Sequence, residues 1–190
     1  MSTRLSVTEL SPELGKSGPQ LISRHRMSDD RGHFSRLFCA DELLQAGWSA
    51  PIAQINHSVT SRAGTVRGLH FQREPHAEMK LVSCVRGAVF DVAVDIRPGS
   101  PTRFQAFTAE LSTDNGLAML LPQGFAHGFQ ALSDDCELIY LHSAPHRPGS
   151  EAGLRHDDPA LAIAWPLPVT LVSQRDASLP LVSALMAEEA

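Results

Sequence analysis

The chain is poor in lysine, tyrosine and cysteine. Its 190 residues include two lysines, one tyrosine and three cysteines. The cysteines Cys39, Cys84 and Cys136 are odd in number and far apart, which argues against a disulfide framework and favours a reducing, cytoplasmic environment. None of them belongs to a CxxC pair, so we do not expect a zinc site built on thiolates.

Long apolar runs and an excess of positive charge are also missing. No apolar stretch approaches the ~20 residues that a membrane-spanning helix needs. Residues 1–16 have no apolar core behind their early arginine, which argues against a secretory signal. The formal net charge of −5 argues against broad nucleic-acid binding, which uses net-positive surfaces. We therefore expect neither a membrane nor a nucleic acid as partner.

The composition that is left is that of an ordinary globular protein. Hydrophobic residues make up 43% and charged residues 19% of the chain, which excludes wholesale disorder. A compact fold of this size buries roughly 70% of the surface of its unfolded chain, so it needs neither a metal nor a disulfide for stability. The length predicts a single domain over residues 1–190.

Short apolar segments separated by turn residues dominate the sequence. Segment 88–96 alternates most cleanly, with an apolar face opposite Asp91 and Asp95. One helix is expected at 40–47 and a weaker one at 181–188. Many short strands with little helix predict a mainly β fold, a sandwich or closed barrel. The expected strands are 52–59, 65–72, 79–86, 88–96, 104–111, 117–121, 126–132 and 136–143, and residues 157–168 are expected to cross the surface in an extended form.

The segment GTVRGLHFQ, residues 64–72, is the first candidate for chemistry. Gly68 in the middle of a strand indicates a bulge or a close approach by a ligand or another backbone. In an ideal strand Arg67 and His70 would point to opposite faces, whereas a bulge at Gly68 could bring both toward one cavity. For His70 alone, a hydrogen-bonded core histidine is the plainer interpretation.

The segment PQGFAHGF, residues 122–129, is the second candidate. Its P-x-G-x-x-H spacing, which ends at His127, resembles the second signature segment of cupins, which are small jelly-roll barrels. Many cupins bind a metal, but their other ligands usually include an H-x-H pair, and here Phe71 and Gln72 follow His70. Two convincing ligands are fewer than a catalytic metal needs. We therefore predict a cupin barrel without a metal.

Three single residues could also take part, although each has a plainer explanation. Lys80 begins an apolar strand, where a lysine is usually a solvated edge residue. Tyr140 lies inside an expected strand and could be a core or rim residue. Asp176, in SQRDASLP, could simply form a turn or a helix cap. A functional role for these residues is supported only if they match a known family pattern together.

Taken in order, the segments resemble the dTDP-4-dehydrorhamnose 3,5-epimerase family over most of the chain. The resemblance implies a metal-free cupin-type jelly roll and a homodimer, in which the N-terminal arm (about 1–50) crosses to the partner subunit and the C-terminal segment (about 157–190) packs on the barrel. The matching segments are DDRGHFSRLF from residue 29, QINHS, GTVRGLHFQ, the KLV strand, VFDVAVDIRPGSPT, LPQGFAHGFQALS, ELIY, DDPALAIAWPL and SQRD up to residue 176.

The resemblance also implies a reaction. The family's substrate is a dTDP-linked 4-keto-6-deoxy sugar, whose C3 and C5 protons lie next to a carbonyl, so removal of either leaves an enolate. Inversion then needs a base, an acid on the opposite face and a cation at the oxygen, and no cofactor. By the match, His70 is the base and Asp176 holds its other ring nitrogen. Tyr140 is the proton donor and Lys80 stabilises the enolate.

The remaining matched positions concern binding. Arginine supplies fourteen of the sixteen lysine and arginine residues. Arginine grips phosphate groups through two parallel hydrogen bonds, and the diphosphate of the substrate therefore explains part of this excess over lysine. Asp91 lies on the polar face of its strand and could orient one of the site residues. The positions expected to bind substrate are Arg31, Arg36, Gln54, Asn56, Arg67, His127, Glu151 and Arg175; Arg31 is expected to complete the neighbouring subunit's site.

Several positions depart from the family pattern and keep alternatives open. Arg36 stands where several members have a glutamate, and Ile55 where an acidic residue is common. Leu141, Pro145 and His146 replace a frequent lysine and two tyrosines. The base and acid are untouched, so we expect 3,5-epimerisation; the alternatives are inversion of only one carbon of a related sugar nucleotide, or a cupin that binds a nucleotide sugar or a metal without epimerising.

Overall fold

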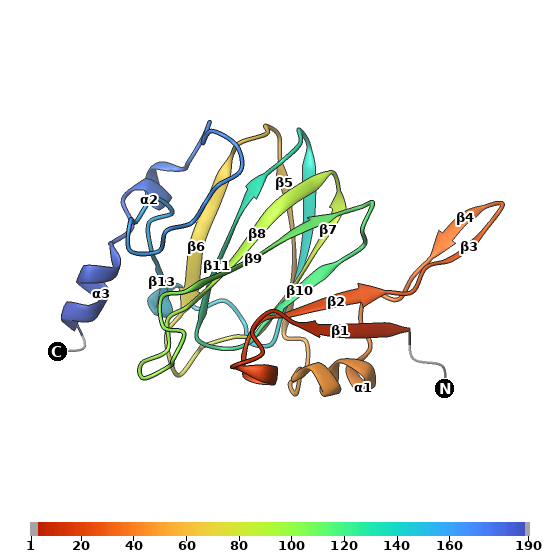
Figure 1. The fold of residues 1–190 in the computed structure, drawn as a ribbon, viewed down its shortest axis with the longest axis horizontal. Helices are drawn as coiled ribbons and strands as arrows, with labels where there is room; N and C mark the ends of the chain where they lie inside the picture. Colours follow the sequence, from red (N-terminus) through yellow and green to blue (C-terminus); the bar gives the residue numbers. More distant parts are fainter. Residues whose placement is uncertain (1–3, 189–190) are drawn as a thin grey trace.

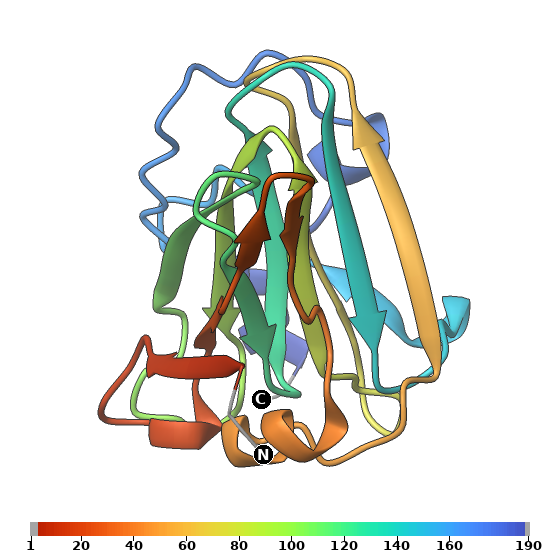
Figure 2. The same ribbon diagram turned by 90° about the vertical axis from the view of Figure 1, so that its right-hand side faces the viewer.

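The computed structural model describes residues 4–188, which form two antiparallel β-sheets facing each other (Figures 1 and 2). The six-stranded sheet has the order β1 (Leu5–Glu9), β2 (Gln20–Arg24), β10 (Ala118–Leu121), β7 (Lys80–Arg86), β12 (Cys136–His142), β5 (Gln54–Thr60). The five-stranded sheet has the order β13 (Glu151–Gly153), β6 (Val66–Gln72), β11 (Phe125–Ala131), β8 (Ala88–Asp95), β9 (Ala106–Ser112). The sheets do not close into a barrel, so the predicted mainly β jelly-roll fold is confirmed in its sandwich form.

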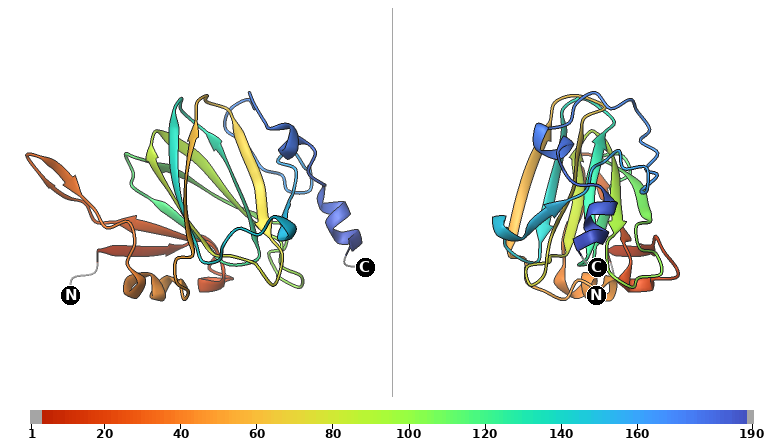
Figure 3. Two further views of the ribbon diagram at one scale, coloured as in Figure 1. Left: turned by 180° about the vertical axis from the view of Figure 1, so that it is seen from behind. Right: turned by 90° about the vertical axis from the view of Figure 1, so that its left-hand side faces the viewer.

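All eight expected strands are present, with ends that differ by one or two residues. The strands that the sequence did not indicate are β13 and those of the N-terminal arm. β3 (Met27–Asp29) and β4 (Gly32–Phe34) form a hairpin that projects away from the two sheets (Figures 1 and 3).

The helices are short, as predicted. The expected helix at 40–47 is one α turn, α1 (Ala40–Leu43), continued as the 3₁₀ turn η2 (Leu44–Ala46) and ended by Gly47 at φ +98°. Glycine suits that end because other residues are strained at positive φ. The weaker helix expected near the C-terminus is α3 (Val182–Glu188).

Three further short elements were not expected: the 3₁₀ turns η1 (Gly15–Ser17) and η3 (Pro148–Ser150), and the helix α2 (Gln174–Ala177). In α2 the Ser173 hydroxyl caps the first turn by accepting a hydrogen bond from the Asp176 amide. No helix among residues 4–188 is long and apolar enough to span a membrane.

Both faces of β8 are buried, which fixes how the layers stack. Val92 and Val94 belong to a cluster with Leu161 and Leu185 of the C-terminal segment. The opposite face of β8 carries Asp91, which is 0% exposed, and looks toward the space between the sheets. Both faces of this alternating strand are therefore buried. The apolar face packs on the C-terminal segment, and the polar face points into the space between the two sheets.

Candidate active site

A bulge in β6 decides which side chains enter the space between the sheets. His127 of β11 pairs with His70, and Phe129 pairs with Arg67, so that two residues of β6 stand opposite Gly128 alone. Gly68 has φ +122°, and a Cβ atom there would lie 2.6 Å from the Gly128 Cα. Only glycine fits this conformation and this approach. The predicted bulge is confirmed, and Arg67 and His70 both line one cavity.

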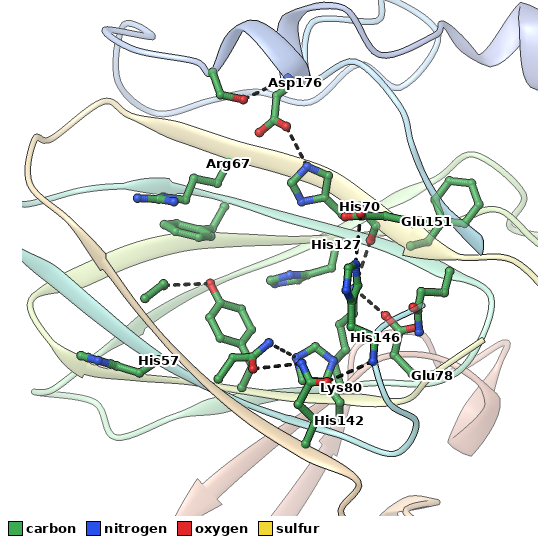
Figure 4. A pocket seen from close by; sticks show the side chains of 18 of the residues that line it. His57, Arg67, His70, Glu78, Lys80, His127, His142, His146, Glu151 and Asp176 are labelled. Carbon is green, nitrogen blue, oxygen red and sulfur yellow. Dashed lines mark hydrogen bonds and ion pairs between the residues drawn. The ribbon is translucent and has the colours of Figure 1, made fainter. Parts of the chain in front are cut away.

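The cavity lies between the sheets and has a volume of about 800 Å³ (Figure 4). Strands β5, β6, β7, β11 and β12 contribute side chains to its wall, together with the segment around α2. The sequence-predicted residues that line it are His70, Lys80, Tyr140, Asp176, Gln54, Asn56, Arg67, His127, Glu151 and Arg175.

His70, which is half-buried, and Asp176, which is buried, form a dyad although 106 positions separate them in sequence. The His70 Nε2 lies 2.8 Å from Asp176 Oδ1, and the Gly68 amide donates to Oδ2 at 3.1 Å. Burial alone would raise the pKa of Asp176, but these hydrogen bonds outweigh it and the pKa lies below its ordinary value. The pKa of His70 is lowered, mainly because burial disfavours the imidazolium and in spite of Asp176. The arrangement suits a histidine that is neutral at rest and can accept a proton.

Tyr140 enters the same cavity from the opposite sheet. Its hydroxyl lies 3.3 Å from the Ser58 Oγ, and the edge of the His127 ring meets the phenol at a centroid distance of 6.0 Å. Burial raises the pKa of Tyr140, so the phenol carries its proton at neutral pH. A protonated phenol can donate to a carbanion formed in the cavity.

Lys80 is not the solvated edge residue that its position at a strand start indicates. It is 7% exposed, because β7 lies between β10 and β12 in the sheet. Its Nζ donates to the His70 carbonyl at 3.1 Å and pairs with Glu78 Oε1 at 3.1 Å. A buried cation held by two oxygen partners can stabilise a developing negative charge in the cavity.

His127 and Asp91 form a second dyad, and both side chains of this dyad are buried. The His127 Nε2 lies 2.8 Å from Asp91 Oδ1, with side-chain exposures of 6% and 0%. Asp91 therefore holds the His127 ring through a hydrogen bond, and the role of His127 in substrate binding stays a prediction. The other Asp91 carboxylate oxygen is buried and makes no hydrogen bond within residues 4–188.

The other cavity residues predicted to bind substrate are half-buried or exposed. Gln54 donates to Asn56 Oδ1 at 3.0 Å, and Arg67 is held by the Thr60 hydroxyl and the Val59 carbonyl at 3.0 and 2.9 Å. Arg175 forms an ion pair of 2.6 Å with Glu151, which also contacts His146 at 3.1 Å. These polar and cationic groups can bind an anionic, hydroxyl-rich ligand.

Arg31 and Arg36 are not among the residues that line the cavity. Arg31 lies at the tip of the β3–β4 hairpin, 90% exposed, and pairs with Asp29 at 2.5 Å. Arg36 pairs with Glu42 of α1. Within one chain these two arginines do not join the other predicted residues, and their role in binding stays a prediction that needs a second subunit.

Two cavity residues were missed, one of them although a signal was present. Glu78 lies two positions before Lys80, and His142 two positions after Tyr140. Strand alternation puts Tyr140 and His142 of β12 on one face, so Tyr140 marked its neighbour. Glu78 precedes β7, which begins at Lys80, and no strand pattern marked it. Glu78 is the buried partner of Lys80. No group of three or more histidine, cysteine, aspartate or glutamate side chains suited to a metal ion occurs in the described part of the chain.

Comparisons with known proteins agree with this geometry. The family model described as dTDP-4-dehydrorhamnose 3,5-epimerase matches residues 15–184. The chain is 46% identical over 162 residues to the dTDP-4-dehydrorhamnose 3,5-epimerase of Sinorhizobium fredii, covering 85% of this chain and 83% of that protein. It is 43% identical over 164 residues to the dTDP-4-dehydrorhamnose 3-epimerase of Streptomyces niveus, covering 86% and 79%.

A solved structure extends the likeness to three dimensions. The crystal structure of the dTDP-6-deoxy-D-glucose-3,5-epimerase of Legionella pneumophila in complex with dTDP-4-keto-L-rhamnose matches with a TM-score of 0.87 at 37% identity, covering 96% of each chain. The sequence match, the fold and the cavity point the same way: this chain belongs to the dTDP-4-dehydrorhamnose 3,5-epimerase family.

Proposed function

We propose that the chain epimerises dTDP-4-keto-6-deoxy-D-glucose at C3 and C5, giving dTDP-4-keto-L-rhamnose without a cofactor. The observation that carries the proposal is the pairing of His70–Asp176 with Tyr140 across one cavity, a neutral base and a protonated phenol from opposite sheets. Family membership makes an epimerase the enzyme class.

In the first step His70 takes the proton from C3 or C5. Each of these carbons is next to the C4 carbonyl, so the electron pair left behind moves onto the carbonyl oxygen as an enolate. Asp176 keeps the imidazole oriented and stabilises the imidazolium that forms. The positively charged ammonium group of Lys80 stabilises the negative charge that develops on the enolate oxygen.

In the second step Tyr140 returns a proton to the opposite face of the same carbon, and the configuration inverts. Its raised pKa keeps it protonated until the carbanion is formed. The tyrosinate then regains a proton from solvent, and the histidine loses one, so each inversion exchanges a substrate hydrogen for a solvent hydrogen. His127, held by Asp91, contacts the sugar in this scheme.

The nucleotide end binds at the mouth of the cavity. Arg67 and Arg175 grip the diphosphate, and Gln54, Asn56 and Glu151 hold the neighbouring hydroxyls and phosphate oxygens. Arg31 and Arg36 come from the partner subunit of a homodimer with exchanged N-terminal arms. Exposed apolar side chains support a covering subunit, among them Phe34 on the hairpin (62%), Leu37 (43%), Ile55 (61%) and Val59 (46%).

Inversion of a single carbon is the second candidate. It is favoured by Pro145 and His146, which stand where the family often has two tyrosines, with His146 lining the cavity, and by the 43% identity to a protein named a 3-epimerase. The same base and acid serve either outcome, since only the way the sugar lies in the cavity differs.

One experiment separates the candidates. The protein is incubated in deuterium oxide with dTDP-4-keto-6-deoxy-D-glucose, and label and configuration at each carbon are followed by proton NMR. Label and inversion at C3 and C5 support the proposal, and label at one carbon supports the second candidate. Absence of label at both carbons, with nucleotide binding or stoichiometric metal by elemental analysis, would favour a non-epimerising cupin.

A further inference from the structure

His142 is a cavity residue that the proposed mechanism does not use. It follows Tyr140 by two positions on β12, so both side chains point into the cavity. In the strand register it stands between Gln54 on β5 and Lys80 on β7. Figure 4 shows its ring in the group that includes Lys80 and His146.

The His142 ring lies against Tyr140. The two rings are stacked, with 6.2 Å between centroids and 25° between planes. The edge of His127 meets the phenol at 76°, and Ser58 holds the hydroxyl. Tyr140 is therefore fixed by contacts of different geometry, and His142 supplies the one between near-parallel, offset rings.

A chain of hydrogen bonds fixes the His142 ring itself. The His146 backbone amide can only donate, and it does so to Gln54 Oε1 at 3.0 Å. The Gln54 amide nitrogen then donates to Asn56 Oδ1 at 3.0 Å. This leaves Asn56 Nδ2 to face His142 Nε2 at 3.4 Å, and because Nδ2 has no lone pair for hydrogen bonding, Nε2 must accept.

The charge state agrees with this assignment. Burial, with the nearby Lys80, His127 and His146, lowers the pKa of His142 to about 4. The ring is thus neutral at physiological pH and carries its proton on Nδ1. It has no carboxylate partner of the kind that His70 and His127 have within residues 4–188, which suits a fixed ring rather than a proton acceptor.

We propose that His142 is a positioning residue for the acid: held by the Gln54–Asn56 hydrogen-bond chain, its ring keeps the Tyr140 phenol in the orientation that delivers a proton to the carbanion. The inference rests on the proposed function and deepens it, because it links residues expected to bind the nucleotide to the group that completes inversion. With a misplaced phenol, the His70 imidazolium would exchange its hydrogen with solvent and return a solvent hydrogen to the face from which the proton was taken.

The test compares the rates of hydrogen exchange and inversion in three variants. His142→Ala removes the ring, and His142→Phe keeps a ring without the acceptor nitrogen. His25→Phe, which changes an exposed histidine outside the cavity, is the control. In deuterium oxide, His142→Ala should incorporate label with retained configuration, raising the ratio of exchange to inversion by at least about tenfold, a part of the roughly 10²–10⁴-fold that a positioned acid contributes. His142→Phe keeps a ring but loses the hydrogen bond to Asn56, so it should raise the ratio less than His142→Ala does, and it should raise KM about fivefold, the net effect of one lost hydrogen bond.

A spectroscopic readout is independent of turnover. Tyr140 is the only tyrosine, so the tyrosinate difference absorbance reports it alone. Its titration should move to lower pH in His142→Ala and stay unchanged in His25→Phe. An exchange-to-inversion ratio and a tyrosine titration that both match wild type in a folded His142→Ala protein would overturn the inference. Absence of exchange in the wild type would instead refute the proposed function.

Discussion

At the scale of single residues, the cavity holds histidines in two settings. His70 and His127 each bind a buried carboxylate, at 2.8 Å in both dyads, and such a partner stabilises an imidazolium when one forms. His142 faces an amide and the Lys80 ammonium instead, and its pKa falls to about 4. The same residue type can therefore suit the proposed role of proton acceptor or that of a fixed neutral ring, according to its neighbours.

Replacing the proposed base and acid should separate the two half-reactions. We expect His70→Asn to abolish label uptake from deuterium oxide, because no other group in the scheme removes the C3 or C5 proton. Tyr140→Phe should lower the inversion rate at least about 10²-fold while slow exchange continues, because general acid catalysis contributes roughly that much. NMR of the product measures both rates; equal inversion by Tyr140→Phe and the wild type would contradict the assignment.

The pH profile follows from the shifted pKa of His70. The base must be neutral, so kcat/KM should rise as pH increases through the pKa of His70 in the free enzyme. Because burial lowers that pKa, the midpoint of the acid limb should lie below about 6.5, the usual histidine value.

Asp176→Asn tests the effect of the Asp176 carboxylate on the pKa of His70, which is opposite to that of burial. The carboxylate raises the pKa of His70, so its neutralisation should move the acid limb to still lower pH, with a lower plateau because the imidazolium loses its partner. Profiles of kcat/KM against pH for both proteins measure the shift. A limb displaced toward higher pH would show that the dyad does not control the titration.

At the scale of elements, the bulge in β6 is the device that builds the site. It lets Arg67 and His70, three positions apart, line the same cavity. Gly68 also donates its amide to Asp176, so the bulge and the dyad share a residue. The short helix α2 completes the arrangement, because its Ser173 cap sets the Asp176 backbone.

Gly68→Ala should therefore damage both stability and activity. A non-glycine residue at φ +122° is strained by about 1–3 kcal/mol, and the added methyl group would meet the Gly128 backbone. Gly99→Ala is the matched control, because Gly99 also has positive φ (+75°) but nothing within 4 Å of the added atom. Chemical denaturation should show the larger loss for Gly68→Ala; equal losses would mean that the close approach is unimportant.

At the scale of the whole molecule, the N-terminal hairpin stands apart from the cavity that its arginine is predicted to serve. Arg31 is 90% exposed at the hairpin tip, and the hairpin extends from the sheets on the side opposite α3 (Figures 1 and 3). A contribution of Arg31 to binding thus depends on a second copy of the chain.

Mixed dimers test this arrangement. Arg31→Ala and His70→Asn should each have low activity. A refolded equal mixture should regain about a quarter of wild-type activity, because half of the random dimers are mixed and each has one intact site. Sedimentation equilibrium should report a dimer. No gain over the separate variants, or a monomer, would contradict the exchanged arm.

The sequence alone predicted the eight strands from β5 to β12 and most of the charged and polar residues that line the cavity, because alternation and turn residues act locally and the ordered motifs resemble one family. It also indicated the bulge, since Gly68 interrupts a strand. Tertiary structure decided what depends on contacts between distant segments: Lys80 is buried because β7 lies inside its sheet, and Asp176 reaches His70 across 106 positions. The neutral state of His142 likewise arises from neighbours on other strands, which no local pattern encodes.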